Sequence, residues 1–77
     1  MDEQPQISES GTMRVTVNGE PKQLPADATV TSLLARLKLT PNQVAVEVNK
    51  RLRRAADYDR PLADGDTIEL VTFVGGG

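Results

Sequence analysis

The sequence predicts an α+β fold, with a mixed sheet of about four to five strands covered by one main helix. Three observations favour it: apolar and polar residues alternate in several short segments, one segment has apolar residues at helical spacing, and 77 residues allow a single domain. Neither a hairpin nor one short helix can bury its own apolar face, whereas a helix laid across a sheet buries both.

The chain is expected to open with a β-hairpin. Apolar and polar side chains alternate over residues 13–17, which is the period of a half-buried strand. Asn18-Gly19 follows, and this pair tolerates two positive φ angles in a tight hairpin turn. Because Pro21 has no amide proton, we expect only residues 22–24 to pair, as a short edge strand.

One main helix is predicted over roughly Val30 to Leu37. Thr29 is a suitable N-cap, because its hydroxyl can accept a hydrogen bond from an unpaired amide of the first turn. Pro41 prevents the helix from continuing. Four apolar side chains share one helical face at i, i+3, i+4 and i+7: Val30, Leu33, Leu34 and Leu37.

The C-terminal half is expected to supply the remaining strands. In order, it holds a strand at 44–48, a turn at Asn49-Lys50, a short return at Arg51-Leu52, an irregular segment at 53–63, a turn at Asp64-Gly65 and a strand at 67–73. The last strand is expected to join the first in parallel, with the helix in the crossover, which is the order of a β-grasp fold. The predicted core comprises Val15, Val17, Leu33, Leu34, Leu37, Val46, Ile68 and Leu70.

This reading divides the chain into three parts. Residues 1–12 are polar and are expected to form a disordered N-terminal extension. The β-grasp domain is expected to span residues 13–74, and residues 75–77 to form a flexible glycine tail.

Composition narrows the function classes. The chain has no Cys and no His, so we expect neither a metal site nor catalysis by its own side chains. Its net charge is −2 and it has one Tyr and one Phe, so nucleic acid and membrane are not expected partners. A small domain without disulfides suits the cytoplasm.

The last three residues are the strongest functional signal. Gly75, Gly76 and Gly77 directly follow Val74 and the final strand. Glycines there add no packing, but they make a thin tail that can enter a narrow channel and present an unhindered terminal carboxylate. A carboxylate is a poor acyl donor until it is activated, so such a tail suits activation by another enzyme. The alternative is an ordinary frayed terminus.

The sequence resembles the ThiS family of thiamine-pathway sulfur carriers. Residues 68–77, preceded by 62–66, are similar to that family's C-terminus, residues 44–49 to its central strand, and residues 17–20 to its first hairpin. The resemblance covers residues 13–77 and implies a ubiquitin-like β-grasp fold. The diglycine end alone is shared with MoaD-type molybdopterin sulfur carriers and ubiquitin-like protein modifiers, and both remain alternatives, as does a plain interaction module.

The resemblance implies a reaction cycle on the Gly77 carboxylate. A ThiF-like adenylyltransferase would use ATP to form an acyl-adenylate, a sulfur-donor system would convert it to a thiocarboxylate, and thiazole synthase, ThiG, would receive the sulfur. The chain would bind no cofactor, would not be an enzyme, and would be a monomer when free. Gly75 and Gly76 would give access to the partner's channel.

The final strand also suggests a partner surface. Val71 and Phe73 alternate with Ile68 and Leu70, so they are expected on the open face of the sheet, where with Val74 they would contact the adenylating enzyme.

Two further clusters have competing interpretations. Lys50, Arg51, Arg53 and Arg54 are either a solvated turn or a docking surface for an acidic face. Asp57, Asp59, Asp64 and Asp66 lack the order of a calcium loop, and turn chemistry explains Asp64-Gly65 better.

Overall fold

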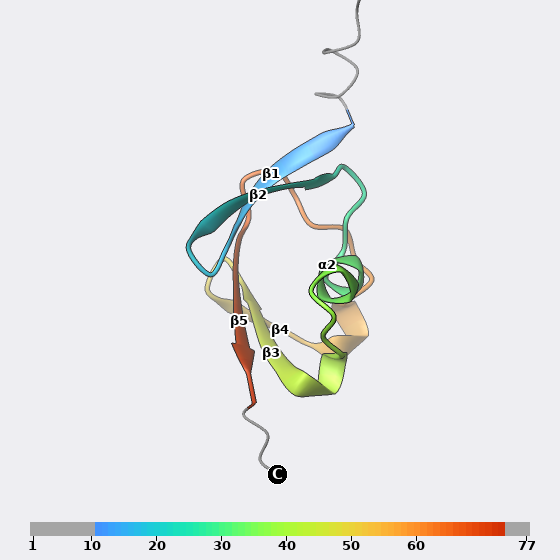
Figure 1. The fold of residues 1–77 in the computed structure, drawn as a ribbon, viewed down its shortest axis with the longest axis vertical. Helices are drawn as coiled ribbons and strands as arrows, with labels where there is room; N and C mark the ends of the chain where they lie inside the picture. Colours follow the sequence, from blue (N-terminus) through green and yellow to red (C-terminus); the bar gives the residue numbers. More distant parts are fainter. Residues whose placement is uncertain (1–10, 74–77) are drawn as a thin grey trace, which may run out of the picture.

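The computed structural model describes residues 11–73, which form one sheet with one α-helix packed across it (Figure 1). Within this range the strand order is β2-β1-β5-β3-β4. The strands are β1 (Thr12–Val17), β2 (Glu20–Pro25), β3 (Val44–Val48), β4 (Arg51–Arg53) and β5 (Thr67–Thr72). The helix is α2 (Val30–Arg36), and short 3-10 helices span Pro41–Gln43 and Ala55–Asp57. The predicted β-grasp architecture is confirmed.

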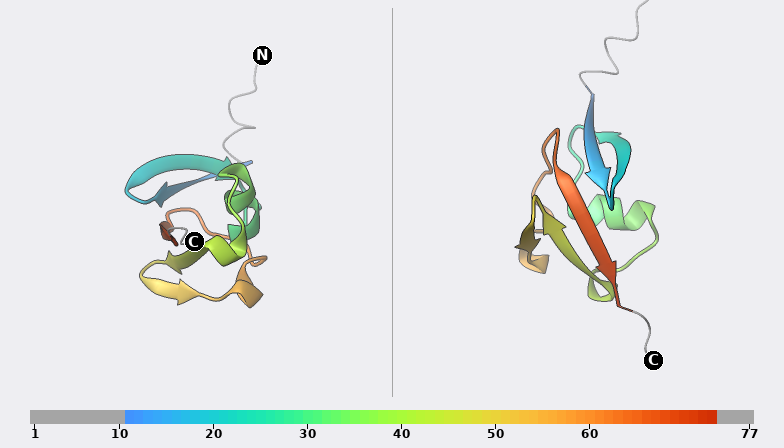
Figure 2. Two further views of the ribbon diagram at one scale, coloured as in Figure 1. Left: turned by 60° about the horizontal axis from the view of Figure 1, so that its bottom comes forward. Right: turned by 90° about the vertical axis from the view of Figure 1, so that its left-hand side faces the viewer.

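The last strand lies in the middle of the sheet. β5 pairs in parallel with β1 through Thr16–Thr67 and Val17–Ile68, and antiparallel with β3 from Ile68 to Thr72. Figure 2 shows β5 running between the two hairpins, with α2 on one side of the sheet. The predicted parallel pairing of first and last strands is therefore confirmed, and it places the C-terminal end of β5 between both halves of the domain.

The first hairpin forms around the predicted turn. Asn18 and Gly19 have φ of 51° and 85°, the two positive angles that an Asn-Gly pair tolerates. The returning strand is longer than predicted, because β2 begins at Glu20 and includes Pro21. Since β2 is an edge strand, a residue without an amide proton can be accommodated there. β1 also begins at Thr12, one residue earlier than the predicted domain start.

The helix begins at its predicted cap and ends one residue early. Thr29 Oγ1 accepts from the Ser32 amide at 3.0 Å, and the Thr29 amide donates to Ser32 Oγ at 2.9 Å, which forms a capping box. α2 ends at Arg36, and Lys38 adopts a left-handed φ of 61° that turns the chain away. Leu37 is consequently 38% exposed, so its predicted place in the core was wrong.

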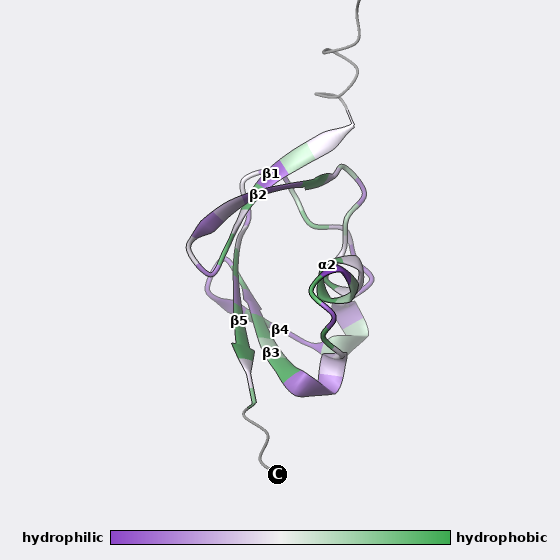
Figure 3. Ribbon diagram, viewed as in Figure 1, coloured by the Kyte–Doolittle hydropathy of each residue, from purple (hydrophilic) through white to green (hydrophobic). Residues whose placement is uncertain are grey.

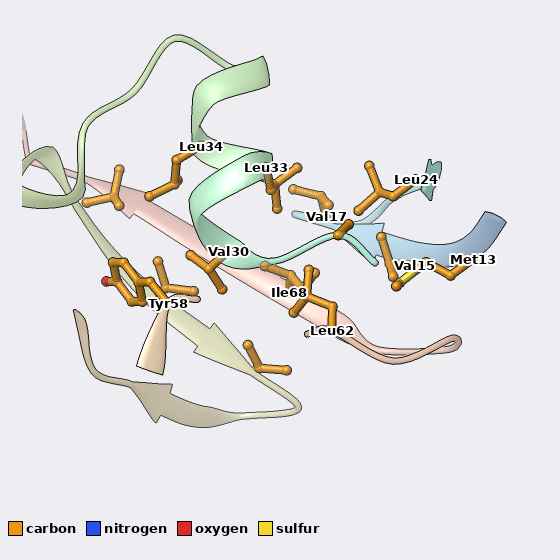
Figure 4. Packing of buried hydrophobic residues seen from close by; sticks show 14 residues of the cluster. Met13, Val15, Val17, Leu24, Val30, Leu33, Leu34, Tyr58, Leu62 and Ile68 are labelled. Atoms are coloured by element: carbon orange, nitrogen blue, oxygen red, sulfur yellow. The ribbon is translucent and has the colours of Figure 1, made fainter. Parts of the chain in front are cut away.

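The core lies between α2 and the sheet (Figure 4). It contains six of the eight predicted residues, and Leu70 packs against it from a half-buried position. Tyr58 and Leu62, from the segment predicted to be irregular, are also buried. They are held by backbone hydrogen bonds from Thr31 N to Tyr58 O at 3.0 Å and from Leu62 N to Ala28 O at 2.8 Å. The remaining core members are Met13, Leu24, Ala28, Val30, Val44 and Val48. Figure 3 shows the apolar character concentrated along β3 and β5 and the polar character of the outer strand β2.

Candidate functional site

The backbone that leads to the predicted reactive terminus is fixed from both sides. On one side, the Phe73 amide donates to the Gln43 carbonyl at 2.8 Å, beyond the last strand residue, Thr72. On the other, Asn18 closes the ladder where β1 ends: its Oδ1 accepts from the Leu70 amide at 2.7 Å and its Nδ2 donates to the Leu70 carbonyl at 3.2 Å. The chain is thus held in register as far as Phe73. Val74, Gly75, Gly76 and Gly77 lie outside the described residues.

A second turn asparagine clamps the beginning of the same strand. Asn49 has a φ of 54°, its Oδ1 accepts from the Thr67 amide at 2.9 Å, and its Nδ2 donates to Asp66 Oδ1 at 2.9 Å. Asn18 and Asn49 therefore each combine a positive φ with side-chain hydrogen bonds to β5 or to the residue before it. The sequence predicts both turns, and positive φ for the first, but nothing in the local pattern indicates the bonds to a distant strand.

Val71 and Phe73 are exposed, as the alternation of β5 predicts. They are 60% and 59% exposed, on the side of the sheet away from α2. Strand register adds neighbours that the sequence interpretation did not include: Ala45 lies opposite Val71, and Leu52 of β4, 66% exposed, lies opposite Glu47. We call this surface the open face; it comprises Ala45, Glu47, Leu52, Glu69, Val71 and Phe73.

The open face carries an unfavourable charge pair at its centre. Glu47 of β3 and Glu69 of β5 are direct cross-strand partners, and both are exposed. Like charges placed directly opposite in an antiparallel pair destabilise the sheet. An acidic pair flanked by exposed apolar side chains complements a partner surface that is apolar and carries a cation. The pairing could only be found from the register between β3 and β5, since the two residues are distant in sequence.

The loop aspartates have structural roles, as predicted for Asp64. Asp64 Oδ1 accepts from the Arg14 amide at 2.8 Å, next to Gly65 at a φ of 89°. Asp66 is buried and accepts from Asn49 and from the Ala63 amide at 2.8 Å, and Asp59 accepts from a threonine hydroxyl. Within residues 11–73, no group of three or more His, Cys, Asp or Glu side chains is placed to hold a metal ion. Nor does that range contain a helix long and apolar enough to cross a bilayer.

Comparison with known proteins gives a family match over most of the chain. Residues 15–77 match the model of the ThiS family. Among curated proteins, the chain is 38% identical over 66 residues to a thiazole synthase of Paramagnetospirillum magneticum and 41% identical over 66 residues to one of Magnetococcus marinus. Each alignment covers 84% of this chain but 20% of the relative, so the chain spans about a fifth of the length of these relatives.

Solved structures of similar fold include chains that the similarity covers completely. The crystal structure of the thiamine biosynthesis protein ThiS of Geobacter metallireducens is similar with a TM-score of 0.69 and 36% identity, over 84% of this chain and all of that one. A ubiquitin of Caldiarchaeum subterraneum is similar with a TM-score of 0.56 and 26% identity, over 87% of this chain and all of that one.

Proposed function

The chain belongs to the ThiS family, and on that premise we propose that it is a sulfur carrier for the thiazole moiety of thiamine. In this proposal the Gly77 carboxylate is adenylated by a ThiF-like enzyme, converted to a thiocarboxylate by a sulfur-donor system, and used as a sulfur source by thiazole synthase. The observation that carries the proposal is the extent of the family match, which runs from β1 through the terminal glycines.

The chemistry assigns the carrier a passive role. A carboxylate oxygen of Gly77 attacks the α-phosphorus of ATP and pyrophosphate leaves, which gives a mixed anhydride whose acyl carbon is electrophilic. A sulfur nucleophile then attacks that carbon and AMP leaves. The chain has no His or Cys to assist either step, so the acid, base and charge-stabilising groups belong to the partner. Because activation uses ATP, we place the carrier in the cytoplasm. The carrier itself would hold no cofactor.

The open face is the proposed docking surface for the adenylating enzyme. Val71 and Phe73 are the last exposed apolar residues that the structure describes before the tail, so a partner that covers them is positioned to receive Gly77. Val74 directly continues this segment and belongs to the same proposal. Exposed apolar side chains on a small domain often mark a partner site. The Glu47–Glu69 pair adds a charge preference, because a cation of the partner would relieve the repulsion between the two carboxylates.

Thiazole synthase is proposed as the acceptor of the sulfur. The support is that two proteins of that name contain a stretch of about a fifth of their length that is similar to this chain. A carrier-like segment within a synthase chain is consistent with a functional association of the two.

A protein modifier is the second candidate, because the fold is also similar to an archaeal ubiquitin. A modifier would use the same activated C-terminus but would transfer its acyl carbon to a lysine amine and remain attached. A MoaD-type carrier would share the thiocarboxylate and differ in the synthase that accepts the sulfur.

The test is mass spectrometry of the chain after incubation with its adenylating enzyme, ATP and a sulfur source. We expect a mass gain equal to the difference between sulfur and oxygen, located on the C-terminal peptide. A matched control carries one additional Ala after Gly77. It keeps the fold and the open face but moves the carboxylate by one residue, so it should gain no sulfur. Equal sulfur incorporation in both chains would overturn the terminal-carboxylate mechanism, and covalent adducts with lysines of other proteins would favour the modifier.

A further inference from the structure

A pocket lined by three arginines lies beside β4, and Leu52 is the one residue of the open face among the residues that line it. It has a volume of about 540 Å³, and its polar lining consists of Asn49, Arg51, Arg53, Asp57, Arg60 and Asp66. Arg51 and Arg53 are two positions apart on β4 and share one face of that strand, and Arg60 joins them from the loop after the second 3-10 helix. We call this site the arginine pocket, after Arg51, Arg53 and Arg60.

Positive charge is concentrated around this pocket, although the chain as a whole is acidic. Residues 50–60 contain five of the nine basic residues, and two acidic ones. Of the two pocket aspartates, Asp66 already accepts hydrogen bonds from Asn49 and the Ala63 amide. Asp57 is 3.9 Å from Arg60, and the side chains are 44% and 72% exposed, so this contact is a weak surface pair. The pocket therefore has more cationic donors than committed acceptors.

One donor in the pocket has no acceptor among residues 11–73. Nη1 of Arg53 is closed off from solvent and makes no hydrogen bond to any described residue. A charged donor that is removed from water without a partner costs free energy, so this position of the guanidinium is unfavourable. It also means that Arg53 would break no hydrogen bond at Nη1 by turning toward an anion that enters the pocket. The guanidinium of Arg53 can therefore donate to an external carboxylate, which an arginine can bind through two parallel hydrogen bonds.

The pocket is continuous with the proposed partner surface across a single strand. β4 is the outer strand of the sheet, and its alternation places Leu52 on the open face and its two arginines on the opposite side. A partner that covers Leu52 and passes around this edge reaches the pocket without crossing any other element of the sheet.

We propose that the arginine pocket is a docking site for an acidic segment of the adenylating partner, with an Asp or Glu side chain held by Arg51, Arg53 and Arg60. The inference rests on the proposed function for the identity of the partner. It adds a second anchor of opposite character to the open face: one surface is apolar and acidic, and the other is a basic pocket around the edge of β4. Two anchors on adjoining surfaces fix the orientation of the carrier, and therefore the direction in which its C-terminus approaches the partner.

The test measures binding of the purified adenylating partner to Arg51→Gln, Arg53→Gln and Arg60→Gln chains by calorimetry, alongside ATP–pyrophosphate exchange. Gln keeps the polarity and most of the length of the side chain but removes the charge. We expect each variant to raise Kd about 10- to 100-fold, as for a lost hydrogen bond to a charged group. KM for the carrier in the exchange reaction should rise in parallel, with kcat unchanged. The salt dependence of binding should also weaken, because one screened attraction has been removed.

Arg36→Gln is the matched control, since Arg36 is an exposed arginine in the last turn of α2 and does not line the pocket. Kd values of the three pocket variants equal to that of Arg36→Gln would overturn the proposal. Saturation of the arginine NMR signals by millimolar inorganic phosphate, with normal partner binding by all three variants, would overturn it in favour of a free oxyanion. Arg51 and Arg60 are exposed, so their variants report on binding even if Arg53→Gln disturbs folding. ATP–pyrophosphate exchange with the unmodified chain tests the proposed function. The ratio of the Kd of each pocket variant to the Kd of Arg36→Gln tests the pocket, so the proposed function and the pocket proposal can fail separately.

Discussion

Asn18→Gly isolates the side-chain clamp that holds the C-terminal half of β5. Gly adopts the φ of 51° without strain, so the turn is kept while the two hydrogen bonds to the Leu70 backbone are removed. Two partly exposed hydrogen bonds are worth about 0.5–1.5 kcal/mol each. The greater flexibility of Gly in the unfolded chain adds about a few tenths of a kcal/mol to this loss of stability, and release of the left-handed strain of Asn subtracts a similar amount. We expect a net loss of about 1–3 kcal/mol.

Urea and thermal unfolding measure this loss. For a domain of this size, each kcal/mol lowers Tm by about 4–8 °C. Amide hydrogen exchange adds a local readout, because the Leu70 amide loses its acceptor and should exchange faster than the amides of β3. Lys50→Gly is the matched control: Lys50 has a φ of 70° but no side-chain bond to β5, so its variant should be within about 0.5 kcal/mol of the parent or more stable. Unchanged exchange at Leu70 in Asn18→Gly would refute the clamp.

Three further predictions address the core, the open face and the terminus. Leu34→Ala should lower the free energy of unfolding by about 2–5 kcal/mol in urea titrations, because Leu34 is 1% exposed between α2 and the sheet; a smaller loss would mean that the site collapses readily. Glu69→Gln should stabilise the domain by about 0.2–1 kcal/mol by removing the repulsion with Glu47, and should weaken the complex with the adenylating enzyme; a destabilised domain or tighter binding would contradict the role of the pair. Phe73→Ala should weaken that complex by more than about 1 kcal/mol in calorimetry with little change in Tm, whereas a large drop in Tm would place Phe73 in the core.

The sequence was sufficient to predict those parts of the fold that depend on local periodicity. Alternation along β1, β3 and β5, the capping residue Thr29 and the positive-φ turn at Asn18-Gly19 all appear as predicted. The exposure of Val71 and Phe73 follows from the same two-residue period, so these two apolar residues of the candidate site were also predictable. These features depend on residues close together in the chain.

Leu37 failed for a local reason, whereas the other failures depend on contacts between distant residues. Leu37 continues the helical period, but the left-handed turn at Lys38 ends the helix before Leu37 can face the core. Tyr58 and Leu62 have no period at all, and hydrogen bonds to the start of α2 and to the segment before it place them in the core. The Glu47–Glu69 pair requires the register of β3 on β5, and the arginine pocket requires β4 to meet a loop that is irregular in sequence.

The division of the sheet into two faces explains why a domain this small can carry an unfavourable surface. Its stabilising burial lies on the α2 side, where the core includes residues of every strand except β4. Substitutions on the open face therefore affect few of the contacts that maintain the fold. The identity of its exposed residues can consequently suit a partner without loss of the fold; these are the two carboxylates, Leu52, Val71 and Phe73. The clamps by Asn18 and Asn49 connect the two faces functionally, because they hold β5 in one register and so keep its outward side chains at fixed positions on the open face. Loss of a clamp should consequently weaken partner binding more than its cost in stability alone would require, whereas loss of Leu34 should affect binding only in proportion to the unfolded fraction.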